Sequence, residues 1–291
     1  MGISRLVGST RLSWPKSFSC RMLPDRCMNC RVTTSLCELP PHSERRVGLS
    51  KPELAEHTLP DLRIVAVSDT HGNFSTLQVP CGDVFVHAGD FTMSESDPSE
   101  VAAFLKWVRA LPHKHKILVP GNHDPLFADD TGLVARNLGH THVLVDRSVT
   151  INGVVFYGTP WSRVPGSRAF SLPEGDRGEQ KWKKIPDNVD VSISHAPAYG
   201  VLDFDTKVAR NVGEVGLRDR VDRIQPTVHI CGHVHDGAGV SSSRDVLAVN
   251  CAIVDRRLCP VRGPRVLDLT GFTVKAGCAA RGAPLRAVSH W

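Results

Sequence analysis

Five short apolar runs, separated by polar segments, set the pattern of the chain from residue 62 to residue 231. They span residues 62–67, 84–87, 116–119, 189–194 and 227–231. Runs of this length match β-strands, and runs without regular polar alternation are typical of strands that are buried on both faces. We therefore predict five buried strands in this part of the chain.

Helical periodicity appears between the second and third predicted strands. Asp97 can cap a helix, Pro98 suits its first position, and Glu100 completes a capping box. Apolar residues then recur at helical spacing: Val101, Phe104, Leu105, Val108 and Leu111. A weaker helical pattern spans residues 210–224. Strands that alternate with helices favour βαβ units and an α/β fold.

Two hairpins are predicted in the C-terminal half. Residues 148–157 carry Asn152-Gly153 between two β-rich arms, which is the signal of a type I′ turn. Residues 265–274 contain Thr270-Gly271 at their centre, and we expect a second hairpin there. Antiparallel hairpins beside parallel strands predict mixed sheets.

Composition divides the 291 residues into three parts. Residues 1–60 are rich in Cys, Arg and Ser without sustained periodicity, which is typical of a disordered extension or of an organellar targeting segment. We predict a folded domain over residues 61–275 and a frayed Gly/Ala/Arg-rich tail over residues 276–291. Without an apolar N-terminal run that resembles a secretory signal, we expect an intracellular protein, with the cytoplasm favoured over an organelle.

Charge and hydropathy exclude several classes of partner. The net charge of +5 belongs mostly to residues 1–60, so the predicted domain is nearly neutral. We therefore expect no nucleic-acid partner and no membrane partner for the domain. No run approaches 18 apolar residues, so we expect no membrane-spanning helix. The sequence leaves the oligomeric state open.

Side chains that can bind metals follow each of the five predicted strands. The strands end in SDTH, AGDF, PGNHDP, SHAP and CGHVH. In open α/β sheets, ligands bind beyond the carboxyl ends of the strands. Seven candidate ligands lie there: Asp69, His71, Asp90, Asn122, His195, His233 and His235. Glycine precedes three of them, where we expect the backbone to turn sharply.

The seven candidates supply imidazole, carboxylate and amide oxygen, and no thiolate. This donor set suits borderline divalent metals such as Mn, Fe, Zn, Co or Ni. Seven ligands exceed the needs of one ion. Two ions about 3.5–4 Å apart, sharing one carboxylate, would use all of them. The sequence therefore predicts a dinuclear metal centre.

The ordered series D-x-H, G-D, G-N-H-D, H and G-H-x-H resembles the calcineurin-like metallophosphoesterase superfamily over residues 62–249. The segments GDFT, GNHD, YGTPW, KW-x-x-IP and GHVH resemble its small metallophosphoesterase-domain-containing branch. The resemblance implies an α/β sandwich of two mixed β-sheets flanked by helices. That branch is associated with hydrolysis of cyclic nucleotides or related phosphodiesters.

The resemblance also implies a role for each candidate residue. One metal would be bound by Asp69, His71 and His235, and the other by Asn122, His195 and His233, with Asp90 as the bridging carboxylate. His123 would be the catalytic imidazole that faces the substrate. Asp124 would orient His123, although a cap or a turn residue is the alternative role for Asp124.

These expectations define a function and its rivals. We predict a dinuclear-metal phosphoester hydrolase that acts on a small nucleotide phosphodiester and uses a metal-bridging hydroxide as nucleophile. A phosphomonoesterase or protein phosphatase is one alternative, and a nucleotide-binding protein with negligible turnover is another.

Four residues of one loop are further candidates for substrate contact. Trp161 and Phe170 either stack a nucleobase or anchor the loop on the core. Arg163 and Arg168 either meet a phosphate or remain solvated.

Overall fold

The computed structural model describes residues 62–93, 97–128, 140–163, 168–172 and 176–270, and the backbone of three short strands beyond them. The predicted extension over residues 1–60 lies outside the described residues. Among the helices in the described ranges, none combines the length and the apolar character that crossing a membrane would require.

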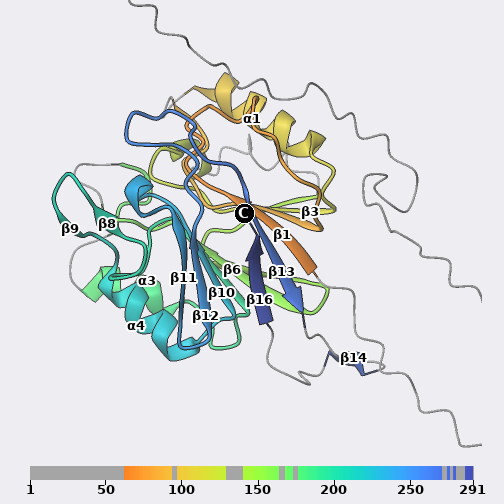
Figure 1. Cartoon of the computed structure of the whole chain (residues 1–291), viewed down its shortest axis with the longest axis vertical. Coiled ribbons are helices and arrows are strands. Elements are labelled where there is room, and N and C mark those ends of the chain that lie inside the picture. The colour runs from red at the N-terminus through yellow and green to blue at the C-terminus, as the bar shows by residue number, and fades with distance from the viewer. Residues whose placement is uncertain are drawn as a thin grey trace, which may run out of the picture. The chain divides into compact units, whose positions relative to one another are not determined.

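The first of two large sheets has the strand order β16-β13-β1-β2-β3-β4 (Figure 1). Strands β1 to β4 run parallel to one another. β13 pairs antiparallel with β1, and β16 pairs antiparallel with β13 at the edge. The strands are β1 (Leu62–Val67), β2 (Val84–His87), β3 (His115–Leu118), β4 (Thr141–Val143), β13 (Arg265–Thr270) and β16 (Arg286–His290).

The second sheet has the order β11-β12-β10-β7-β6-β5, with four parallel strands between two antiparallel edges. Its strands are β5 (Arg147–Ile151), β6 (Val154–Thr159), β7 (Val191–Ser194), β10 (Val228–Cys231), β11 (Gly239–Ser243) and β12 (Val246–Asn250). Two small hairpins pair β8 (Phe204–Asp205) with β9 (Arg210–Asn211), and β14 (Val274–Lys275) with β15 (Cys278–Ala279).

The main core fills the space between the two sheets, and side-chain alternation decides which residues enter it. Val84 and Val86 of β2 point into this core, whereas Phe85 points to the opposite face. There Phe85 packs in the cluster of Phe104 from α1 (Pro98–Ala110). Burying both faces of a strand explains why these runs lack polar alternation.

Helices cover the outer face of the second sheet as well. Trp182 of α3 (Asp176–Lys183) and Leu217 of α4 (Val215–Ile224) pack in one cluster with Tyr157 of β6. In Figure 1, α1 lies over one sheet and α3 and α4 lie over the other. Two 3-10 turns, η1 (Pro125–Phe127) and η2 (His235–Gly237), follow β3 and β10. The predicted sandwich of two mixed sheets flanked by helices is confirmed.

Predictions from local sequence were confirmed where a particular residue determines the backbone conformation. The Oδ1 atom of Asp97 accepts a hydrogen bond from the Ser99 N–H at 2.8 Å, which confirms the predicted start of α1. Asn152 and Gly153 have φ of 48° and 83°, as a type I′ turn requires between β5 and β6. The helix predicted from residue 210 begins only at Val215, because residues 210–211 pair as β9.

The prediction of a hairpin over residues 265–274 is wrong. β13 pairs with β1 and with β16, whereas β14 pairs with β15. The first sheet therefore extends into residues 286–290, within the segment that we predicted as a tail. Long-range pairing of β13 with a central strand buries Leu267 and Leu269, which a local hairpin would leave exposed.

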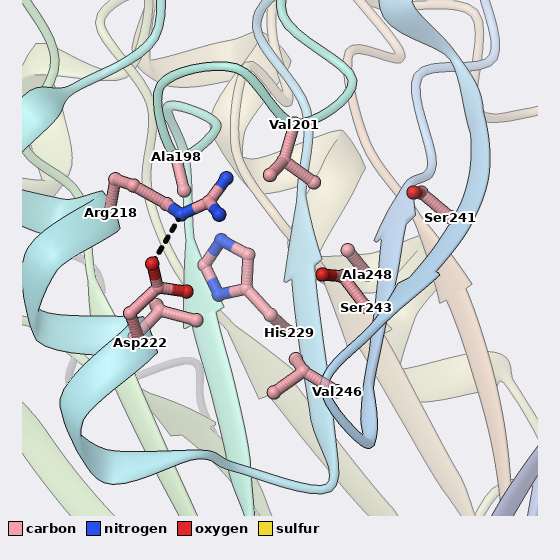
Figure 2. Close-up of a pocket in the computed structure, with 10 residues that line it drawn as sticks. Ala198, Val201, Arg218, Asp222, His229, Ser241, Ser243, Val246 and Ala248 are labelled. Atoms are coloured by element: carbon pink, nitrogen blue, oxygen red, sulfur yellow. Dashed lines mark hydrogen bonds and ion pairs between the residues drawn. The ribbon is translucent and has the colours of Figure 1, made fainter.

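A small cavity opens on the outer face of the second sheet, between α4 and the β11–β12 hairpin. Figure 2 shows the His229 ring between Arg218 and Asp222 of α4 on one side and Ser241 and Ser243 of β11 on the other. Arg218 Nε donates to Asp222 Oδ2 at 2.8 Å. His229 itself is buried, and its Nδ1 atom has no hydrogen-bond partner.

Candidate metal centre

The carboxyl ends of strands from both sheets converge on one site. β1, β2 and β3 of the first sheet lead into Asp69, Asp90 and Asn122, while β7 and β10 of the second lead into His195 and His233. Backbone hydrogen bonds join these strand ends, including Asp69 N–H to Gly89 O at 2.8 Å and Gly232 N–H to His195 O at 2.9 Å. The loops that carry the seven predicted ligands are therefore fixed against one another.

One cluster of potential ligands contains Asp69, His71 and His235, whose ligand atoms all lie within 4.8 Å of one another. Nε2 of His235 lies 3.3 Å from Oδ1 of Asp69. Asp69 is fully buried, and its carboxylate also accepts hydrogen bonds from the Ser68 hydroxyl and from the His233 N–H. These are the three residues that the resemblance assigns to one metal.

A second cluster contains Asp90, His195 and His233, again with ligand atoms within 4.8 Å of one another. Nε2 of His195 lies 3.4 Å from Oδ1 of Asp90 and 3.0 Å from Oδ1 of Asn122. The other carboxylate oxygen of Asp90 lies 3.7 Å from Nε2 of His71, in the first cluster. Asp90 therefore contacts one imidazole of each cluster, which is the arrangement expected of a shared carboxylate.

His123 lies half-buried at the edge of these clusters. Its ring centroid is 4.9 Å from that of His71, and its backbone N–H donates to Oδ1 of Asp90 at 2.9 Å. The ligand atoms of His71, Asp90 and His123 also lie within 4.8 Å of one another. The geometry therefore allows His123 to face a substrate, as the resemblance implies, and would also allow it to bind a metal.

Asp124 contacts the backbone and not the His123 ring, which corrects the role that the resemblance implies. Its carboxylate accepts hydrogen bonds from the Gly121 N–H at 2.8 Å and the Phe91 N–H at 3.0 Å. These bonds join the loops after β2 and β3, which carry Asp90 and Asn122. Burial and the nearby Asp90 charge raise the pKa of Asp124 to about 8. Asp124 is thus a positioning residue of the loop.

Backbone carbonyl groups orient two of the histidines. Nδ1 of His195 lies 2.9 Å from the Ala88 carbonyl, and Nδ1 of His235 lies 3.1 Å from the Asp255 carbonyl. A carbonyl only accepts, so each Nδ1 carries the hydrogen and each Nε2 is left to act as a ligand. The sequence gives no sign of these partners, because any residue supplies a carbonyl.

Mutual charge keeps the carboxylates ionised despite their burial. Burial raises the pKa of Asp69, but a hydrogen bond with His235 and its charge outweigh that effect and lower the pKa to about 2. Burial also raises the pKa of Asp90, but the charge of His195 and a hydrogen bond from it hold that pKa well below its usual value. Both carboxylates are therefore ready to act as anionic ligands at neutral pH.

Four of the seven candidate ligands occupy the left-handed backbone region. Asp69, His71, Asp90 and His233 have φ of 54°, 39°, 56° and 66°. Residues other than glycine rarely adopt this conformation, and such strain concentrates at functional sites. Each strand here turns abruptly on its ligand, which directs the side chain back toward the centre.

Glycines before the ligands are required by close approach. A Cβ atom at Gly232 would collide with Ser68 Oγ and Asp69 Oδ2, and one at Gly121 would collide with Asp90 Oδ1. A sharp turn is therefore only part of the reason for glycine at these positions. After β10 the positive φ belongs to His233 and not to Gly232. Glycine is needed there because a Cβ atom would collide with the carboxylate.

Three of the loop residues predicted to touch substrate make contacts within the protein itself. Nε1 of Trp161 donates to Asp146 at 2.9 Å, and the Lys181 ammonium lies 3.4 Å from the centroid of its ring. Phe170 is buried with an edge-on contact to Trp161 at 5.9 Å between centroids. These contacts favour anchoring over base stacking. Arg163 pairs with Glu214 at 3.7 Å.

Comparison with known proteins places this geometry in a family. The family model for calcineurin-like phosphoesterases matches residues 62–237. The chain belongs to the calcineurin-like phosphoesterase family. Human metallophosphoesterase domain-containing protein 1 is 36% identical over 231 residues, which cover 71% of this chain and 71% of that protein. A UPF0046 protein of Caenorhabditis elegans is 33% identical over 229 residues, covering 72% of this chain and 81% of that protein.

The fold agrees with this assignment. One solved structure superposes with a TM-score of 0.51 at 15% identity, covering 72% of this chain and 95% of that chain. Calcineurin-like phosphoesterases use divalent metals, and the residues present fit such ions. Both ring nitrogens of buried His71 lack a hydrogen-bond partner, and a metal would give one of them a partner. The chain is a metal-dependent phosphoester hydrolase.

Asn250 is a functional residue that the sequence did not reveal. Its buried Nδ2 donates to the Val234 carbonyl at 2.9 Å and the Leu202 carbonyl at 3.1 Å, and lies 3.4 Å from the Gly232 carbonyl. Two of these carbonyls flank His233, so Asn250 holds the turn that presents this ligand. An amide at the end of β12, distant in sequence from the G-H-x-H segment, carries no local signal of that role.

Asn250→Ser is expected to weaken metal binding roughly 10- to 100-fold, the loss typical of removing a group that orients a ligand. The shorter side chain cannot reach the Val234 and Gly232 carbonyls together, so the His233 turn relaxes. Calorimetric titration with Mn²⁺ measures the effect, and Asn211→Ser on β9 is the control. Unchanged affinity would contradict a positioning role for Asn250.

Proposed function

We propose that the chain hydrolyses phosphodiesters of small nucleotides with two divalent ions. The observation that carries the proposal is Asp90, which lies 3.7 Å from an imidazole of one ligand cluster and 3.4 Å from an imidazole of the other. A carboxylate shared in this way supports a pair of ions. Mn, Fe, Zn, Co and Ni all suit a donor set of imidazole, carboxylate and amide.

Each residue of the site has a proposed role in metal binding or proton transfer. Asp69, His71 and His235 would hold one ion, and Asn122, His195 and His233 would hold the other. When bound, such ions would supply a nucleophile from solvent at neutral pH and Lewis acidity for the phosphoryl oxygens. His123, half-buried beside His71, contacts the substrate and donates a proton from its ring to the leaving oxygen.

Two features support a small diester as substrate. The segments GDFT, GNHD and GHVH resemble the branch associated with cyclic nucleotides and related diesters. Residues 61–291 carry 26 basic and 25 acidic side chains, so the domain lacks the charge excess that tracking a nucleic-acid backbone requires. We accordingly propose a small phosphoester partner, and neither a nucleic acid nor a membrane.

The test is an assay of full-length protein, stripped of metal and reloaded with Mn²⁺, on a bis-aryl and a mono-aryl phosphate. We expect metal-dependent turnover of both, with the higher kcat/KM on the bis-aryl diester. A preference for the monoester would favour a phosphomonoesterase. Nucleotide binding by calorimetry without turnover would favour a binding protein of this fold.

A further inference from the structure

The cavity on the outer face of the second sheet contains a buried polar atom that lacks a partner. It lies between α4 and the β11–β12 hairpin, and His229 of β10 is among the residues that line it (Figure 2). The His229 side chain is 1% exposed, and its Nδ1 atom has no hydrogen-bond partner among the described residues. Buried polar atoms of native proteins nearly always have a partner. A group that enters the cavity would supply the missing one.

A neighbouring serine determines which hydrogen-bonding role Nδ1 of His229 has. The Ser194 hydroxyl donates its only hydrogen to the Ala196 carbonyl at 2.5 Å. Toward Nε2 of His229, at 3.4 Å, the same oxygen can only accept, so Nε2 carries the ring hydrogen. Burial lowers the pKa of His229 to about 4, so the ring is neutral at neutral pH and Nδ1 is an acceptor. The missing partner must therefore be a hydrogen-bond donor.

The charges beside the cavity exclude a cationic donor. Arg218 Nε donates to the Asp222 carboxylate at 2.8 Å, and the Arg244 guanidinium lies 3.9 Å from the same carboxylate. Two positive groups thus share one negative group, which leaves an excess of positive charge that repels a cation. A carboxylate or similar anion has no hydrogen to donate to Nδ1. The donor must therefore be uncharged, as the hydroxyl group of an alcohol is.

The size and lining of the cavity favour a small donor group on an apolar body. The centre of a water-sized group can move within about 20 Å³, which is enough space for one or two such groups. Aliphatic side chains line much of this space: Val201, Val221, Val246 and Ala248. A hydroxyl group fits the inner space, and methyl groups attached to its carbon gain from contact with the aliphatic walls.

We propose that this cavity is a binding site for small uncharged alcohols, whose hydroxyl group donates a hydrogen bond to Nδ1 of His229. The site lies on the outer face of the second sheet, whereas the metal centre lies at the carboxyl ends of the strands. Alcohol binding is thus a property of this chain beyond phosphoester hydrolysis and does not depend on it. The two sites share strand β7, because Ser194, which contacts His229, directly precedes the candidate ligand His195.

Three probes of nearly the same shape test the site: 2-propanol, acetone and acetate. All of them carry their oxygen on a central carbon, but 2-propanol donates a hydrogen bond, acetone only accepts one, and acetate is an anion. Binding is followed by NMR titration of the nitrogen-15-labelled full chain at about pH 7.5, where a neutral imidazole is expected. The signals observed are the imidazole nitrogens of His229 and the backbone amides around the cavity.

We expect 2-propanol to bind roughly 3- to 10-fold more tightly than acetone, which is the gain from one neutral hydrogen bond. Acetate should bind more weakly than either, because its charge would be buried against an acceptor. In His229→Leu, which keeps the apolar volume, 2-propanol should lose its advantage over acetone. Ala248→Val places extra methyl groups beside His229 on the neighbouring strand β12 and should weaken both probes. His142→Leu on β4 of the first sheet is the control and should change neither affinity.

Equal affinities of the parent for 2-propanol and acetone, or signal shifts that do not saturate, would overturn the proposal. Tighter binding of acetate than of 2-propanol would also overturn it, because the cavity would then be an anion site at the two arginines. The imidazole nitrogens of His229 provide a test without probe or variant, since a bare and a protonated Nδ1 have different NMR frequencies. A protonated Nδ1 in the free parent would remove the acceptor that the site requires. None of these results depends on turnover at the metal centre.

Discussion

Asp90→Asn is expected to lower kcat/KM on the bis-aryl phosphate by more than about 10²-fold, the loss typical of removing one electrostatic group from a preorganised centre. The carboxylate lies between His71 and His195, one from each ligand cluster. Asparagine has nearly the same shape but no negative charge, so it cannot balance two cations. Metal content measured by elemental analysis should fall below that of the parent.

The variant should fold, which separates a chemical loss from a structural one. Burial raises the pKa of Asp90, but His195 holds it well below its usual value, so the parent contains a buried ionised group. Asparagine removes that charge. Its carbonyl oxygen can still accept the hydrogen bond that the His123 N–H donates to Asp90 Oδ1 at 2.9 Å in the parent. Asp268→Asn, which breaks a surface pair with Arg63, is the matched control. Full metal content and turnover in Asp90→Asn would refute a shared-carboxylate site.

The sequence predicted the central strands and the candidate ligands because both depend on local constraints. An unbroken apolar run such as that of β1 can be satisfied only by burial on both faces. The candidate ligands follow such runs closely, so within each sheet they meet at one edge because the strands are parallel. Packing of the two sheets against each other then brings the two edges together. The glycines at 121 and 232 also mark the site in the sequence, because the neighbouring carboxylates leave no room for a Cβ atom there.

What the sequence could not predict depends on partners that are remote along the chain. β13 looked like one arm of a hairpin, yet it pairs with β1 about 200 residues earlier, with Leu62 opposite Leu269. Asp124 looked like a partner of its neighbour His123, but its oxygens accept from the backbone of the loop after β2. Spacing alone does not reveal which backbone groups fold back onto a carboxylate.

The β11–β12 hairpin was missed because its turn lacks the usual residues. Arg244 and Asp245 occupy it with φ of 49° and 66°, the values of a type I′ turn, without asparagine or glycine. Pairing of Ser241 with Ala248 and burial of Val246 under α4 outweigh the poor fit of these residues to the turn. Tertiary packing overrode local preference here, and it hid the strand that carries Asn250.

Acid is expected to destabilise the protein partly through His229, and His229→Leu should remove that part. Burial lowers the pKa of His229 from 6.5 to about 4, so below pH 6.5 the unfolded chain takes up a proton that the folded chain excludes. Its contribution to stability is intact above pH 6.5 and falls as the pH drops toward 4. The full shift corresponds to about 3 kcal/mol.

Other ionisable groups also change stability with pH, so the informative quantity is the difference between parent and variant in the free energy of unfolding. Measured by urea unfolding at about pH 7.5 and about pH 4.5, that difference should shift by about 2.5 kcal/mol in favour of His229→Leu. Leucine suits a site lined by Val201, Val221 and Val246. The control is Ile230→Val on the same strand, which should cost about 0.5–1.5 kcal/mol equally at both pH values. If the difference in free energy of unfolding between parent and His229→Leu did not change with pH, His229 would be protonated in the folded protein. Solvent in the cavity of Figure 2 would then supply the missing partner of its Nδ1 atom.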